Sequence, residues 1–132
     1  MSDPSFHDGL PVITSPRNER LRFVRALRSR KTRHQRERYL IEGPKAIEEL
    51  LAHGGQLDPL LYRAQPTLPT RAAEALARAQ AAGVPCYPVL AKVFDEAAPS
   101  ETPQALLAIA HLSWTSLEEL CQAGEGPRGV AA

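Results

Sequence analysis

Apolar residues recur at helical spacing in the first well-patterned stretch of the chain. Ser15-Pro16 is a helix start, with a hydroxyl residue at the cap and proline at the first helical position. From there Leu21, Val24 and Leu27 follow each other every three residues. The pattern predicts a helix over 16–30 with one apolar side. For the polar segment 31–37, a further helical turn and a loop both fit.

Beyond that segment, short apolar runs alternate with amphipathic stretches. Such an alternation predicts a largely parallel four-stranded sheet with helices on both faces, an α/β fold. Pro85 and Pro88 place the third strand at an edge or on a bent path. The last strand is fully apolar, so we expect it at the centre. The strands are expected at 39–42, 57–62, 84–89 and 105–112, and the helices at 44–54, 71–82 and 91–97.

The two ends of the chain lack a core-forming pattern. We expect an N-terminal tail at 1–14, one domain at 15–112, and at 113–132 a linker or the start of a further domain. The first nine residues are polar and lack the order of a signal peptide. The stretch 124–132 is expected to be disordered. The longest apolar run, Ala105 to Ala110, is far shorter than the roughly 20 residues that a membrane span needs.

Charge is distributed unevenly along the 132 residues, although the formal net charge is only +1. The segment 16–38, called here the arginine block, holds ten cations and two acidic residues. The remainder, called here the body, is therefore acidic. Unpaired like charges repel along a helix unless an anion neutralises them, so we favour a nucleic-acid partner over a merely solvated face. The ten cations are Arg17, Arg20, Arg22, Arg25, Arg28, Arg30, Lys31, Arg33, Arg36 and Arg38.

Phosphate groups rather than bases are the expected targets of this block. Phe23 is its only aromatic residue before Tyr39 and falls at an apolar helical position. Arginine is expected to pack little on such a helix. Alanine at Arg25, Arg28 and Arg33 should therefore weaken nucleic-acid binding and leave the fold intact.

Recognisable enzyme signatures are absent from the sequence. Gly43-Pro44-Lys45 lacks the flanking glycines of a phosphate loop. Cys86 and Cys121 have no motif spacing, so we expect ordinary thiols in a reducing cytoplasm and no metal site. The four histidines are scattered, and none is placed with a serine, cysteine or acidic residue in the order of a known catalytic triad. They are His7, His34, His53 and His111.

Four residues of the expected strands stand out. Tyr39, Tyr62 and Tyr87 are interpreted as core or core-edge packing with a solvated hydroxyl group. Glu42 ends the first expected strand, directly before a glycine. For this carboxylate, a turn or capping role and a functional role stay equally open.

The order of several short motifs resembles a known family. The motifs are Ile13–Asn18, Leu21–Leu27, Arg33, and Tyr39–Gly43 followed by a helix that ends at Gly54. Together they resemble the N-terminal substrate-binding domain of the SpoU (TrmH) family of RNA 2′-O-ribose methyltransferases, over roughly residues 13–112. In that family, a short helix with an asparagine near its start precedes a strand reading aromatic-leucine-valine-glutamate-glycine.

The resemblance implies a fold like that of ribosomal protein L30e, a three-layer α/β/α sandwich. It implies that the domain holds structured RNA, ribosomal or transfer, while S-adenosylmethionine methylates one ribose 2′-hydroxyl. Asn18 and Arg33 are carried over as RNA-binding residues, and Glu42 and Gly43 as family-motif residues. The other cations of the arginine block are added on electrostatic grounds.

Family members continue into a knotted catalytic domain that supplies the cofactor site, and its motifs are absent here. We therefore expect no catalytic residue and no bound cofactor in this chain, a monomer, and a cytoplasmic location. Whether the chain acts as an enzyme stays open. One alternative is a stand-alone L30e-like protein that binds structured RNA without chemistry. Another is a protein-interaction domain whose arginine helix docks on an acidic partner.

Overall fold

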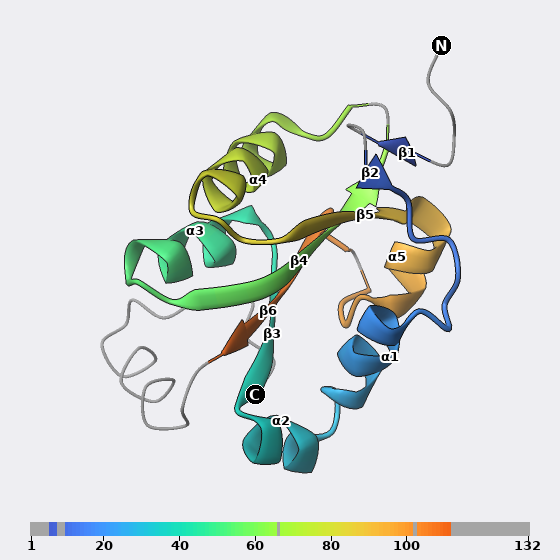
Figure 1. The fold of residues 1–132 in the computed structure, drawn as a ribbon, viewed down its shortest axis with the longest axis vertical. Coiled ribbons are helices and arrows are strands. Elements are labelled where there is room, and N and C mark those ends of the chain that lie inside the picture. The colour runs from blue at the N-terminus through green and yellow to red at the C-terminus, as the bar shows by residue number, and fades with distance from the viewer. Residues whose placement is uncertain (1–5, 8–9, 66, 102, 112–132) are drawn as a thin grey trace.

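Four strands form the central sheet, in the order β3-β6-β4-β5 (Figure 1). The structure is a computed structural model that describes residues 6–7, 10–65, 67–101 and 103–111. The segment 113–132 lies outside the described residues. The sheet strands are β3 (Arg38–Glu42), β4 (Gln56–Ala64), β5 (Cys86–Leu90) and β6 (Leu106–His111). The helices are α1 (Glu19–Ala26), α2 (Arg30–Arg36), α3 (Pro44–Ala52), α4 (Thr70–Ala81) and α5 (Ala91–Ala97).

The prediction of a largely parallel sheet is wrong, because β6 is antiparallel to both of its neighbours. Only β4 and β5 pair in parallel. The reason lies in α5, whose seven residues span about 10 Å, less than a strand of the sheet. The chain therefore re-enters the sheet from the end at which β3 finishes, where the Gln104 N–H donates to Glu42. The two positional predictions are confirmed, since β6 is central and β5 is an edge.

Helices cover both faces of the sheet, and a separate apolar cluster fills each side (Figure 1). On one side α3 and α4 pack over Tyr39 and Tyr62, both fully buried. On the other side α1 and α5 pack over Leu61 and Ile109. The interpretation of the first two tyrosines as core residues is confirmed, but the solvated hydroxyl expected for them is wrong, because both side chains are fully buried. Tyr87 is partly buried against the second cluster.

The helix expected over 16–30 is shorter than expected, because α1 ends at Ala26 and a second helix, α2, begins at Arg30. Asn18 caps α1 and Ser29 caps α2, each accepting an N–H from the first turn of its helix. Short polar side chains compete with the helical backbone in this way and so start helices more readily than they continue them. The polar segment after Arg30 is accordingly helical, and α1 begins three residues later than expected.

Part of the expected N-terminal tail forms two short strands and a bridge to the sheet. Phe6–His7 (β1) and Leu10–Pro11 (β2) form a short antiparallel pair. Ile13 then makes a parallel bridge to Val89 on the outer side of β5. This contact covers an otherwise open sheet edge, which is where unpaired backbone groups promote aggregation.

The described residues contain no membrane-spanning helix, no metal-binding cluster and no reactive thiol. No helix among them is long and apolar enough to cross a membrane. Within the same residues, no three histidine, cysteine or acidic side chains gather as a metal site would require. Burial raises the pKa of the Cys86 thiol to about 11, so it is a poor nucleophile at neutral pH.

Candidate nucleic-acid interface

The cations of the arginine block differ from those of the body in their partners. Among the described residues, none of the ten forms an ion pair with a carboxylate. In the body, by contrast, Arg63 lies 3.0 Å from Asp95, and Arg71 and Arg78 lie 3.4 and 3.7 Å from Glu48. The positive charge of the block is thus left uncompensated within the described fold, as a surface for anions requires.

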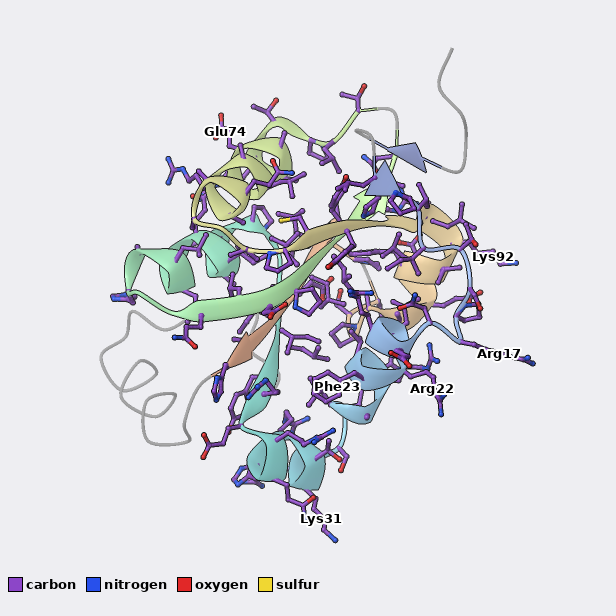
Figure 2. The ribbon with its side chains drawn as sticks, in the orientation of Figure 1. Arg17, Arg22, Phe23, Lys31, Glu74 and Lys92 are labelled. Carbon is purple, nitrogen blue, oxygen red and sulfur yellow. The ribbon has the colours of Figure 1, made fainter. Side chains whose placement is uncertain are left out.

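Most of the block's side chains are exposed. Figure 2 shows Arg17, Arg22 and Lys31 extending away from α1 and α2. Arg25 donates a hydrogen bond to the carbonyl of Pro16, and Arg38 donates to the Arg36 carbonyl at 3.0 Å. Among the described residues, no hydrogen bond, ion pair or ring contact involves the side chains of four exposed cations, Arg17, Arg22, Arg30 and Lys31.

Two guanidinium groups of the block lie over aromatic rings. Arg20 lies 4.0 Å from the ring centroid of Tyr87, and Arg36 lies 5.5 Å from that of Phe23. Cation–π contacts of this kind hold a guanidinium group in place while leaving its N–H donors accessible. Arg20 and Arg36 are therefore partly ordered before any ligand binds, which lowers the entropy cost of binding.

Arg28 and Arg33 form hydrogen bonds that stabilise the fold. Arg33 is only 6% exposed, and its Nη1 donates to the carbonyls of Leu27 and Arg28 at 3.0 and 2.9 Å, just after the end of α1. Arg28 in turn donates to the Ala97 carbonyl at 2.8 Å, at the end of α5. The last carbonyls of a helix lack partners within it, so both guanidinium groups complete helix ends. The expectation that arginine packs little in this segment is wrong at these two positions.

The family-motif residues lie at the opposite end of β3 from α2. Glu42 is 7% exposed, and its Oε2 accepts hydrogen bonds from Ser100 Oγ at 3.0 Å and from the Gln104 N–H at 3.1 Å. This geometry favours the capping role, in which the carboxylate holds the 100–104 loop against the sheet. Asn18 is likewise engaged as the cap of α1, 2.9 Å from the Arg20 N–H. The structure does not bring Glu42 to the exposed cations.

Gly43 takes a backbone conformation that requires glycine. Its φ is +95° and its ψ is 153°, a region essentially closed to residues with a Cβ. A Cβ there would also lie 2.5 Å from Gln104 Oε1, although that side chain is able to move.

Gly43→Ala should therefore lower the free energy of unfolding by about 1–3 kcal/mol. Urea denaturation of this variant measures the loss. Lys45→Ala, an exposed position two residues later, is the control and should stay within about 0.5 kcal/mol. Equal stability of the two variants would show that the strained turn is not formed.

A family model described as the MRM3-like substrate binding domain matches residues 18–108. The chain is 26% identical over 100 residues to the 23S rRNA (guanosine(2553)-2′-O)-methyltransferase RlmP of Bacillus subtilis (strain 168), covering 76% of this chain and 37% of that protein. A crystal structure of an RNA 2′-O ribose methyltransferase superposes with a TM-score of 0.67 at 28% identity, covering 80% of this chain and 39% of the other.

An rRNA methyltransferase from Sinorhizobium meliloti shares the fold, with a TM-score of 0.63 at 23% identity, over 80% of this chain and 38% of that one. The chain spans less than two fifths of the length of each of these relatives. The matched segment runs from the cap of α1 into β6 and so includes most of the sheet and all five helices. The chain therefore belongs to the MRM3-like substrate binding domain family.

Proposed function

We propose that this chain is the RNA-substrate-binding part of a SpoU-type RNA 2′-O-ribose methyltransferase. It holds structured RNA, ribosomal or transfer, through the exposed cations of the arginine block. The observation that carries the proposal is the contrast in ion pairing. The block's cations have no carboxylate partner among the described residues, whereas Arg63, Arg71 and Arg78 of the body all have one.

This chain contributes RNA binding to the reaction. The described residues do not fit the methyl donor. A hollow of about 510 Å³ near the end of β4 is lined in part by Arg63, Arg71 and Asp95. Both Asp95 oxygens already accept from Arg63, at 3.1 and 3.0 Å. The one carboxylate in this lining is thus engaged by Arg63 and is not free to face the sulfonium group of S-adenosylmethionine. No methyl-transfer step is therefore assigned to these residues.

The arrangement of the sheet supports an L30e-like sandwich as the fold of this domain. Helices lie on both faces, and each face has its own apolar cluster. The arginine block includes α1, which covers one face of the sheet, and α2, which directly precedes β3. A cytoplasmic location is part of the same proposal and is supported by the similarity to a bacterial 23S rRNA methyltransferase.

A salt series of RNA binding tests the proposal. Five or so phosphate contacts at once give a slope of log affinity against log salt of about −3 to −5. Alanine at Arg17, Arg22 and Lys31 should flatten the slope by about two units, because each contact contributes about 0.7–0.9. These exposed side chains form no hydrogen bond or ion pair with the described residues, so folding should be unchanged. Fluorescence anisotropy with a structured RNA measures the salt slope of the parent and of the triple variant.

The matched control removes the same number of charges from the body, by alanine at Lys45, Arg71 and Arg78. All three are exposed, and the slope should change little. Equal losses from the two triple variants would mean that the arginine block is not the interface. Negligible binding even at low salt would overturn the proposal and favour an acidic protein partner.

A further inference from the structure

Phe23 lies within the cationic surface, between two hollows. One hollow, of about 230 Å³, is lined by Phe23, Arg36 and Arg38. The other, of about 340 Å³, is lined by Glu19, Arg22, Phe23 and Ala26. The ring packs in part against the core cluster beneath α1 and remains partly exposed. Phe23 thus forms a wall common to two hollows of different charge.

The charges of the two hollows suit different chemical groups. The smaller hollow has two guanidinium groups and no acidic residue in its lining, so it suits a phosphate. The larger one is lined by Glu19 as well as Arg22, beside the apolar surface of Phe23 and Ala26, so a phosphate would meet a carboxylate there. A neutral group with amino donors and an aromatic face suits that lining better. A nucleotide carries both kinds of group at adjacent positions.

Size favours a single nucleotide over a larger ligand. Pockets for drug-sized molecules have volumes of roughly 300–1,000 Å³, and these hollows lie at or below the lower end of that range. The other aromatic side chain of this surface, Tyr87, lines neither hollow, and its ring lies under the Arg20 guanidinium at 4.0 Å. Arg36 is more distant from Phe23, at 5.5 Å.

We propose that Phe23 is a stacking site for one unpaired RNA base. The base lies in the hollow of Glu19 and Arg22, and its phosphate contacts Arg36 and Arg38. This inference rests on the proposed RNA-binding function and adds a preference to it. Bases of an A-form duplex are stacked on each other and unavailable, so the site selects unpaired nucleotides such as those of loops and bulges. The arginine block alone, contacting phosphates, would not make that distinction.

Phe23→Leu tests the stacking site, because leucine retains apolar contact with the core and lacks a π face. Affinity for a single-stranded oligoribonucleotide should fall about 5-fold or more, the lower part of the range for one base–aromatic stack. Affinity for a duplex of equal length should be unchanged, and so should the salt slope, since no phosphate contact is removed. Anisotropy titrations of both RNAs give these values.

Tyr87→Leu is the matched control, the same kind of change at the aromatic ring that Arg20 covers. Its single-strand affinity should stay at the parent value. Three results would each overturn the inference: no single-strand loss in Phe23→Leu, an equal loss for the duplex, or an equal loss in Tyr87→Leu.

A spectroscopic probe separates this inference from the RNA-binding proposal beneath it. In a Trp114→Phe background, which removes the chain's single native tryptophan, Phe23→Trp places the only indole at the site. Single-stranded RNA should quench its emission, and an abasic ribose-phosphate oligomer of equal length should not. Normal binding with no difference between the two oligomers would refute the stacking site alone. Absence of RNA binding in the unaltered chain would refute the proposed function itself.

Discussion

Replacing Ile109 by alanine should lower the free energy of unfolding by about 2–5 kcal/mol. Ile109 is 1% exposed and lies on β6, opposite Leu40 of β3. Its side chain belongs to the apolar cluster beneath α1 and α5. Because β6 is hydrogen-bonded on both sides, the strand is held in place and the cavity left by the smaller side chain collapses poorly. Urea denaturation followed by circular dichroism measures the loss.

Leu90→Ala provides the control at the edge of the same sheet. Leu90 is the last residue of β5 and is 41% exposed, so its truncation removes less buried surface and leaves no enclosed cavity. We expect a loss of about 1 kcal/mol or less. A loss at Ile109 no larger than that at Leu90 would show that β6 is not the central strand.

The position of β6 was predictable from its sequence, and its direction was not. A continuous apolar run is typical of a strand that is covered on both faces, and Leu106–His111 is such a strand apart from its last residue. A strand carries the same donors and acceptors in either direction, so composition does not encode orientation. Here orientation depends on the short α5 and on the Glu42 carboxylate, which holds the loop that leads back into the sheet.

The candidate interface was predictable as a charged segment but not residue by residue. Ten cations within 23 residues are visible in the sequence. Which of them are available depends on where helix carbonyls lack partners, and that follows from the break between α1 and α2. Ser29 is the one signal of that break in the sequence, because a good N-cap residue in the middle of a helical pattern permits a second start. Once the break exists, Arg33 faces carbonyl oxygens instead of solvent. Arg28 stays exposed while it donates to the carbonyl at the end of α5.

Replacing Arg33 by alanine should lower the free energy of unfolding by about 3 kcal/mol, since each hydrogen bond from a charged donor contributes about 1.5–3 kcal/mol. The substitution leaves the carbonyls of Leu27 and Arg28, in a buried and a partly buried bond, without the guanidinium group that now donates to them. Arg33→Lys should restore only part of the loss, because one ammonium on a flexible stem does not reproduce the planar guanidinium fork. Arg30→Ala, exposed on the same helix, should stay within about 0.5 kcal/mol.

Arg30→Ala and Arg33→Ala also show which of the two arginines contacts RNA. At a temperature where each remains folded, Arg30→Ala should flatten the salt slope by about 0.7–0.9, because an exposed phosphate contact is lost. Arg33→Ala should keep the parent slope, because a side chain that is 6% exposed contributes little to the surface that RNA meets. Thermal denaturation and salt-dependent anisotropy on the same preparations give both readouts. The reverse pattern, a stable Arg33 variant with a flattened slope, would place Arg33 among the phosphate contacts and contradict the helix-end role.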